Sequence, residues 1–352
     1  MDKNNIIGMT IIGITMGDPG GVGPEISILS CKYFIEKKNG NIKPLIFGSP
    51  EYIDFVNTSV IKSKLKVNSI SPEIIHNEKD IARLYKNDCI NVIDCSVETY
   101  KAVRFGVENS DYAKDTEKFI LKAVEFAKSG KIKGITTAPI NKDMMIKGGA
   151  MFPAHTELLA YITSAENYAM LFYSKKLITV LSTIHIPLKS VSGKITKNSL
   201  EKIINISCSS LKIDFGINNP HIAVLGLNPH AGENGKIGNE EIDIINPVIA
   251  KFKRDNFNIE GPFPSDSFYA KRYKNFDIVV SMYHDQALIP FKLLSFNYGV
   301  NVTIGLPIVR TSPVHGTAYE IAGKNIADEK SMVYSIMLAS KIANNRMKWK
   351  EK

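Results

Sequence analysis

The stretch IIGITMGDPGGVGPE, residues 11–25, joins a short apolar run to a glycine-rich loop that opens a helix. We predict a buried strand over Ile11–Thr15, because the run has no polar face. The run is too short, and too soon followed by Gly17, to be a signal peptide or a membrane span. Pro24 suits the first turn of a helix, where its missing N–H costs nothing. A strand, a loop and a helix in this order form the unit of a mostly parallel sheet.

Short β-branched runs alternate with helical patterns along the rest of the chain. The clearest helix covers Ala113–Ser129, with apolar side chains on one face and Gly130 placed to end it. The alternation predicts the α/β fold class, with a mostly parallel sheet covered by helices on both faces. The further predicted strands are Leu45–Phe47, Ile90–Ile93, Gly134–Thr137, Leu177–Ser182, Ile222–Leu227 and Asp277–Ser281.

Length and composition predict a protein that folds throughout. A chain of 352 residues fits one large α/β domain or two lobes sharing a cleft, and we expect two lobes. With 44% hydrophobic and 22% charged residues, the composition leaves no room for a long disordered region. No repeat or low-complexity linker marks a boundary between the lobes.

The net charge of the chain and the spacing of its cysteines indicate which binding partners and which cellular compartment to expect. The net charge of +9 would suit an anionic ligand or nucleic acid. The lysines are scattered, however, and no basic run alternates with aromatics, so we expect a solvated surface and no nucleic-acid groove. The four cysteines form no CxxC pair, and a reducing cytoplasm is the simplest setting.

Three of the seven histidines follow predicted strands. His185 comes after LITVLSTI, His230 after IAVLGLNP, and His284 after DIVVSMY. Ligands of open α/β sheets collect at the carboxyl edge of the strands, where all three histidines are expected. Each one alone suits a structural hydrogen bond at least as well as a metal. Together they favour a divalent metal site with an open position for substrate.

Two side chains accompany the histidine of the YHDQALIPFK segment, residues 283–292. Asp285 could orient the neighbouring imidazole, accept a proton or cap a helix. Lys292 suits an exposed surface, but in this setting it could also hold a phosphate.

Further candidate residues lie in two other segments. In HTE, His155 and Thr156 precede a helical pattern, and free N–H groups there would make an anion site. Thr156 could equally be the cap of that helix. Between Gly299 and Lys324, Asn301 offers an amide, and Arg310 offers a bidentate partner for phosphate or carboxylate.

The loop at residues 17–25 superficially suggests a phosphate loop. It lacks the lysine of GxxxxGK[ST] and the spacing of GxGxxG, so both common nucleotide fingerprints fail. We interpret it as a glycine-rich turn.

The motifs together resemble the 4-hydroxythreonine-4-phosphate dehydrogenase family of vitamin B6 biosynthesis. The resemblance extends from near residue 11 to about residue 328. Its motifs, in chain order, are ITMGDPGGVGPE, TTAPINK, HTELLA, HIPL, NPHAGE, MYHDQ, GVNVTIGLPIVRTS and HGTAYEIAGK.

The resemblance implies a role for each candidate residue. His185, His230 and His284 match the ligands of one divalent metal ion (Zn, Co or Mg), and with Asp285 they are the catalytic candidates. A homodimer with its active site at the subunit interface is also implied, so ligands could come from two chains. The positions that match substrate-binding residues are His155, Thr156, Lys292, Asn301 and Arg310.

The implied fold is the two-lobed α/β/α architecture of isocitrate and isopropylmalate dehydrogenases, with the active site in the cleft. NAD or NADP would lie there without a GxGxxG loop. HGTAYEIAGK looks like the adenosine-binding loop of those enzymes, so His315, Gly316, Thr317 and Ala318 are the cofactor candidates. We expect residues 1–145 with 305–352 to form the cofactor lobe, and 146–304 the lobe for metal, substrate and dimer contacts.

The implied reaction is NAD-dependent oxidation of 4-phosphohydroxy-L-threonine at C3, followed by decarboxylation to 3-amino-2-oxopropyl phosphate. A related dehydrogenase of 4-phospho-D-threonate or erythronate in sugar-acid catabolism would use the same motifs. A metal- and phosphate-binding protein without redox chemistry is the alternative from another class, and it would not bind NAD.

The chain departs from the family pattern at two positions. Ala154 stands where glycine usually precedes HTE, and its methyl group could reshape a phosphate pocket or have no effect. The first loop reads GDPGG where GDPAG is usual, so Gly20 is expected to add backbone freedom.

Overall fold

The computed structural model describes residues 9–37, 41–95, 103–152 and 154–351. The chain forms two compact units, which are described separately. Unit 1 runs to Ala165 and resumes over Leu306–Ala343. Unit 2 comprises Glu166–Gly305 and the residues from Asn344 onward. The change after Gly305 lies one residue from the boundary predicted after residue 304, and the other change lies after Ala165, where the prediction was residue 145.

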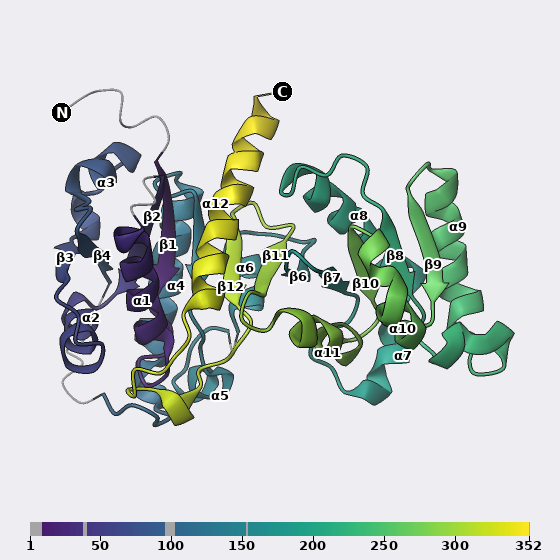
Figure 1. Cartoon of the computed structure of the whole chain (residues 1–352), viewed down its shortest axis with the longest axis horizontal. Helices are drawn as coiled ribbons and strands as arrows, with labels where there is room; N and C mark the ends of the chain where they lie inside the picture. The colour runs from purple at the N-terminus through teal and green to yellow at the C-terminus, as the bar shows by residue number, and fades with distance from the viewer. Residues whose placement is uncertain (1–8, 38–40, 96–102, 153, 352) are drawn as a thin grey trace. The chain divides into compact units, whose positions relative to one another are not determined.

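Unit 1 contains an all-parallel arrangement of strands (Figure 1). In spatial order they are β3 (Lys66–Ile70), β4 (Cys89–Asp94), β2 (Ile42–Gly48), β1 (Thr10–Thr15), β5 (Gly134–Thr137) and β12 (Arg310–Pro313). Every residue of β1 is buried, which confirms the first predicted strand as a central one. The other strands predicted in this unit are also present.

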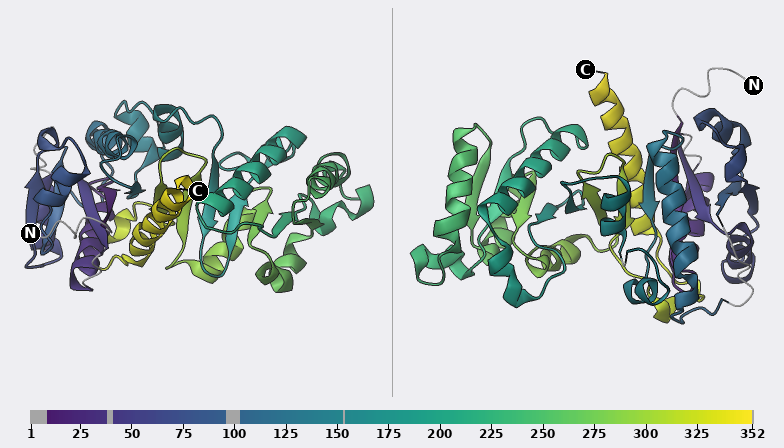
Figure 2. Two further views of the ribbon diagram at one scale, coloured as in Figure 1. Left: turned by 90° about the horizontal axis from the view of Figure 1, so that it is seen from above. Right: turned by 180° about the vertical axis from the view of Figure 1, so that it is seen from behind.

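Helices cover both faces of the unit 1 strands. Helix α1 (Gly23–Glu36) lies on one face and α4 (Ala113–Lys128) on the other, as the views from above and behind show (Figure 2). Gly130 ends α4 as predicted, because its φ of 74° leaves the helical region. The other helical segments are α2 (Pro50–Phe55), η2 (Val56–Val60), η3 (Pro72–Ile74), α3 (Glu78–Leu84), η4 (Ser110–Tyr112), α5 (Lys142–Lys147), α6 (His155–Ile162) and η10 (Tyr319–Ile321).

The strands of unit 2 form both parallel and antiparallel pairs. In spatial order its strands are β11 (Val300–Ile304), β6 (Ala169–Tyr173), β7 (Ile178–Leu181), β10 (Ile278–Ser281), β8 (Ile222–Leu225) and β9 (Ile259–Phe263). The pairs from β7 to β9 are parallel, whereas β6 is antiparallel to both of its neighbours. The α/β class with mostly parallel strands is thus confirmed, and the antiparallel strand was not predicted.

The strands of unit 2 are also covered on both faces. Helices α8 (Lys197–Ile213) and α11 (His284–Ser295) lie on opposite faces (Figure 2). The other helical segments are η5 (Leu188–Ser190), α7 (Val191–Lys194), η6 (Pro229–Gly235), η7 (Glu241–Ile245), α9 (Asn246–Arg254), α10 (Ser265–Ser267), η8 (Phe268–Arg272) and η9 (Tyr273–Asn275).

The longest helix, α12 (Lys330–Lys350), begins in unit 1 and ends in unit 2. In unit 1 its Ser335 carbonyl accepts a hydrogen bond from the Thr311 hydroxyl at 2.9 Å. In unit 2 its Arg346 donates to the buried Asp214 carboxylate at 2.6 Å. Neither α12 nor any other helix of the described residues combines the length and apolar composition needed to cross a membrane.

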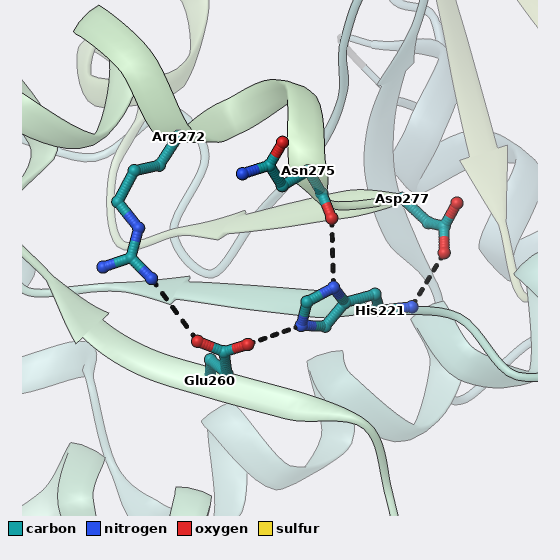
Figure 3. A network of polar contacts seen from close by, with 5 residues as sticks. All are labelled: His221, Glu260, Arg272, Asn275 and Asp277. Atoms are coloured by element: carbon teal, nitrogen blue, oxygen red, sulfur yellow. Dashed lines mark hydrogen bonds and ion pairs between the residues drawn. The ribbon is translucent and has the colours of Figure 1, made fainter.

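One histidine of unit 2 has a structural role. His221, just before β8, contacts Glu260 through Nε2 at 2.8 Å and the Asn275 carbonyl through Nδ1 at 3.0 Å (Figure 3). Its backbone N–H donates to Asp277 at 2.8 Å, and Glu260 also faces Arg272 at 3.5 Å. Both ring nitrogens are therefore engaged by the protein, as in a histidine that holds segments together.

Candidate functional site

Three neighbouring parallel strands of unit 2 lead to the three predicted metal ligands. His185 follows β7, His284 begins α11 after β10, and His230 lies in η6 after β8. Because β7, β10 and β8 are adjacent and parallel, the three segments leave the strands at one edge.

Two of these imidazoles lie close together. The ring centroids of His185 and His284 are 5.5 Å apart. Nδ1 of His284 contacts the Asp285 carboxylate at 2.7 Å, which leaves Nε2 to face a ligand. The N-cap of α11 is Tyr283 and uses no side-chain hydrogen bond, so Asp285 does not cap this helix. Asp285 thus orients the imidazole, as carboxylates beside metal-binding histidines commonly do.

His230 lies in a turn with an uncommon backbone conformation. The five residues from His230 to Asn234 all have positive φ, between 43° and 78°. Such a left-handed conformation costs roughly 1–2 kcal/mol for each residue other than glycine. Strain of this kind persists only where the surroundings hold it, and it is concentrated at functional sites.

Hydrogen bonds tie the three histidine-bearing segments together. Thr183, two residues before His185, donates its hydroxyl to the Met282 carbonyl at 2.7 Å. Gln286 accepts from the Met282 N–H at 2.6 Å and donates to the Gly226 carbonyl at 2.7 Å. The segments around the histidines are therefore fixed in register by buried side chains.

Within the described ranges, no group of three or more His, Cys, Asp or Glu side chains is arranged to hold a metal ion. The close pair formed by His185 and His284, with its orienting carboxylate, still fits a divalent metal in the kind of donor it offers. That His230 binds the same ion as this pair stays a prediction, as does a contribution of ligands from two chains.

Unit 1 holds a buried cationic group. Arg310 begins β12, is 4% exposed, and donates to the Thr137 hydroxyl at 2.8 Å. Burial lowers the pKa of Arg310 to about 10, against the influence of the Glu157 carboxylate. An arginine held in this way suits a phosphate or carboxylate ligand.

His155 belongs to the same group. Burial, then the charges of Arg310 and Lys142, hold the pKa of His155 well below its usual value of 6.5. Its Nε2 is buried and has no hydrogen-bond partner among the described residues. A neutral imidazole with one unused nitrogen beside two cations is suited to meet an anionic ligand.

The start of α6 settles two alternatives left open by the sequence. The N-cap is Ala154, without a side-chain hydrogen bond, so the buried Thr156 is not the cap. Ala154 has φ −139° and ψ 155°, an extended conformation open to any residue. Alanine in place of the usual glycine therefore carries no backbone cost.

The remaining substrate candidates lie in unit 2, and Arg310, His155 and Thr156 lie in unit 1. Lys292 is an exposed residue of α11. Asn301 lies on β11, and its Oδ1 is buried with no hydrogen-bond partner in the described part of the chain. A buried amide oxygen in this state suits a donor group of a ligand.

The cofactor candidates His315–Ala318 lie against the glycine-rich first loop. The Val22 N–H donates to the Thr317 carbonyl at 2.9 Å. A Cβ on Gly21 would stand 2.8 Å from the same carbonyl, so the approach requires glycine there. Ala318 has a positive φ of 46°, and Gly316 has open space around its Cα.

Buried acids of the first loop hold the segment that follows. Tyr319 donates its hydroxyl to Asp18, whose pKa is raised by burial. Glu25 accepts hydrogen bonds from the backbone of Gly323 and Asn325, and burial raises its pKa too. The first loop is therefore more than a generic turn, because it supports the candidate cofactor loop.

Gly20 does not add the backbone freedom expected from the sequence. Its φ is not positive, so its conformation is open to other residues. A Cβ would lie 2.6 Å from the Val107 carbonyl oxygen. The lack of a side chain at Gly20 therefore allows two backbone segments to approach each other closely.

Sequence reasoning missed Lys142 and Thr137, which belong to the same cationic group. Both lie in TTAPINK, which carries part of the family resemblance, and neither residue was assigned a role of its own from the sequence. The run of small and polar residues just past β5 was the available signal.

The low pKa of His155 predicts a pH dependence of stability. Since the folded value lies below 6.5, the unfolded chain binds more protons as the pH falls from 6.5, and stability is lost there. The loss is at most about 1.4 kcal/mol per pH unit from this group. Urea unfolding of wild type and His155→Gln at pH values of about 7.5 and 5.5 should show a smaller loss in the variant. Equal losses would contradict this assignment.

The family model and the curated relatives that match this chain belong to one family of proteins. The family model described as pyridoxal phosphate biosynthetic protein PdxA matches residues 41–339. A 4-hydroxythreonine-4-phosphate dehydrogenase of Sulfurihydrogenibium sp. is 39% identical over 94% of this chain and 98% of its own length. A D-threonate 4-phosphate dehydrogenase of Pectobacterium atrosepticum is 37% identical over 95% of this chain and 99% of its own.

Solved structures that resemble this chain also include those of dehydrogenases. The crystal structure of 4-hydroxythreonine-4-phosphate dehydrogenase from Klebsiella pneumoniae has a TM-score of 0.81 at 34% identity, covering 95% of this chain and 99% of that one. A terephthalate 1,2-cis-dihydrodiol dehydrogenase from Burkholderia xenovorans shares the fold, with a TM-score of 0.62 at 24% identity over 95% of this chain and 98% of its own.

Proposed function

Because the chain belongs to the PdxA family, whose curated relatives are named dehydrogenases, we propose that it oxidises 4-phosphohydroxy-L-threonine at C3 with NAD. Decarboxylation of the 3-oxo acid then yields 3-amino-2-oxopropyl phosphate and CO₂, in pyridoxal phosphate biosynthesis. The chain is an oxidoreductase that acts on a CH–OH group, and a binding protein without redox chemistry does not fit these relatives.

The buried cationic group of unit 1 carries the proposal. A dianionic phosphate offsets the charges of Arg310 and Lys142 and gives the unused Nε2 of His155 a partner. Thr156, Lys292 and Asn301 are the further substrate-binding residues of the proposal. Binding energy from the phosphate end, which does not react, then positions the carbinol for oxidation.

The divalent metal is assigned to His185, His230 and His284. When bound, it supplies Lewis acidity toward the substrate oxygen, and NAD supplies the hydride acceptor. Asp285 fixes the ring of His284 through Nδ1, so that Nε2 points toward the ligand. His315, Gly316, Thr317 and Ala318 are proposed to contact NAD, on the support that the first loop provides.

We also propose a homodimer in which two subunits complete the metal site. The resemblance to this family of dehydrogenases implies the dimer, and one chain supplies the close pair of imidazoles.

A second substrate has support from the comparisons. Relatives named D-threonate 4-phosphate dehydrogenase are almost as similar as those named for the threonine derivative. The two substrates differ at C2, which carries an amine in one and a hydroxyl in the other. Both carry the phosphate, so the cationic group does not distinguish them.

NADH formation separates the candidates directly. The purified protein, supplied with NAD and a defined metal, is assayed with 4-phosphohydroxy-L-threonine, 4-phospho-D-threonate and 4-phospho-D-erythronate. We expect the highest kcat/KM with the threonine derivative. A higher value with the threonate would assign the chain to sugar-acid catabolism, and no NADH with any of them would contradict the proposal.

A further inference from the structure

A buried carboxylate lies beneath the turn that carries His230. Glu241, the first residue of η7, is 2% exposed. Its Oε1 accepts hydrogen bonds from the N–H groups of Leu227 and Asn228 at 2.7 and 2.8 Å. Its Oε2 accepts from Nδ2 of Asn228 at 2.9 Å. All three donors belong to the two residues that precede Pro229 and His230.

The carboxylate also fills the inner side of the turn. A Cβ added to Gly232 would lie 2.7 Å from Oε2, and one added to Gly226 would lie 3.0 Å from Oε1. The backbone on both sides of His230 therefore passes close to the Glu241 carboxylate.

The His230 turn needs such support because of its backbone. Four of its five left-handed residues are not glycine, and this conformation is unfavourable for them. An unsupported turn would relax toward ordinary φ values and carry the imidazole away from its position. Three hydrogen bonds to one buried carboxylate fix the segment that enters the turn.

From these contacts we infer that Glu241 is a positioning residue for His230: it holds the strained turn in the conformation in which the imidazole can bind metal. The inference rests on the proposed function only in taking His230 as a ligand. Packing alone would not call for a charged group here, because burying a carboxylate costs free energy that an apolar side chain would not.

The neighbouring acid supplies a matched control. Glu240 accepts hydrogen bonds from the Asn228 side chain at 2.8 Å and the Ser192 hydroxyl at 2.6 Å, and among the described residues no backbone N–H of the turn donates to it. Glu240→Gln therefore changes the charge one position away without removing the backbone hydrogen bonds. Glu241→Gln keeps the shape of the side chain but sets an NH₂ group against donor groups of the turn.

Metal affinity and amide exchange of the full-length protein test the inference together. Zn²⁺ affinity is measured by competition with a chelator, for wild type, Glu241→Gln, Glu240→Gln and His230→Ala. We expect Glu241→Gln to weaken Zn²⁺ binding by about 10–100-fold, as loss of a supporting partner typically does. Hydrogen exchange of the metal-free protein should be faster in Glu241→Gln over residues 227–235, and Glu240→Gln should match wild type in both measurements.

The outcomes separate the inference from the proposed function. If His230→Ala loses Zn²⁺ but Glu241→Gln binds it like wild type, the inference is wrong and the metal assignment stands. If wild type binds no Zn²⁺, or His230→Ala binds it unchanged, the metal assignment fails and the inference falls with it. Weaker binding in Glu240→Gln equal to that in Glu241→Gln would also overturn the inference, because it would trace the effect to charge alone.

Discussion

Replacing His230 with alanine is expected to abolish both metal binding and turnover. A Lewis acid contributes several kcal/mol to such an oxidation, so kcat/KM should fall by roughly 10²–10⁴-fold. His284→Ala should have an effect of the same size, since its imidazole lies 5.5 Å from that of His185. Metal content measured by mass spectrometry and NADH formation measured after chelation and metal return test this expectation.

His221 is the control histidine. Both of its ring nitrogens contact protein groups, so His221→Asn should lower stability and leave metal content unchanged (Figure 3). Equal loss of metal from His221→Asn and His230→Ala would point to a general defect in folding. Unchanged turnover in His230→Ala would remove the metal from the proposed mechanism.

Mixed dimers show whether two subunits share the site. Chains carrying His230→Ala and His284→Ala are each expected to be inactive. If the two imidazoles of one site come from different subunits, a dimer of one chain of each kind has one intact site and regains activity. Dimers without any recovery would place both ligands in the same chain and contradict the shared site.

Arg310→Met is expected to remove most of the activity while leaving the protein as stable as before. Hydrogen bonds to charged groups contribute about 1.5–3 kcal/mol each, so losing a bidentate contact lowers kcat/KM by roughly 10²–10⁴-fold. Arg310 is buried beside a second cation, Lys142, and the neutral His155, and methionine of similar length removes that desolvated charge. Activity assays and thermal unfolding of the same preparation measure the two effects.

Replacing Arg346 is expected to lower stability and not activity, in contrast to replacing Arg310. Its guanidinium pairs with the buried Asp214, so Arg346→Met leaves a buried carboxylate unpaired and should cost up to about 3–5 kcal/mol of stability. The folded fraction should keep its kcat. A loss of stability in Arg310→Met as large as in Arg346→Met would show that Arg310 is structural, and would contradict its role in phosphate binding.

The strands predicted from the sequence are short apolar or β-branched runs. All seven predicted strands are present, and α4 ends at Lys128, next to the predicted Ser129. The missed strands include the apolar β6, which reads AMLFY, and others with polar or irregular sequences. β12 reads RTSP and β9 reads IEGPF, and residues such as Pro and Gly argue against a strand when the sequence is taken alone. Burial within the fold outweighed these local preferences.

Residues of the candidate site could be predicted from the sequence where the residue type alone indicates the chemistry, as with histidine and arginine. Histidines after strands and an arginine in a motif can be found by scanning the sequence. Glu241 and Gln286 could not be found in this way, because their importance lies in partners that are distant in sequence. The burial that lowers the pKa of His155 likewise comes from tertiary packing, which a sequence pattern does not contain.

The metal assignment is tested most directly by anomalous X-ray diffraction from crystals of the Zn²⁺-loaded protein. We predict one strong zinc peak per site, about 2.0–2.1 Å from a nitrogen of His185, His230 and His284, with two subunits contributing to each site. A peak bound by other side chains, or three imidazoles that remain apart in the assembled protein, would contradict the account.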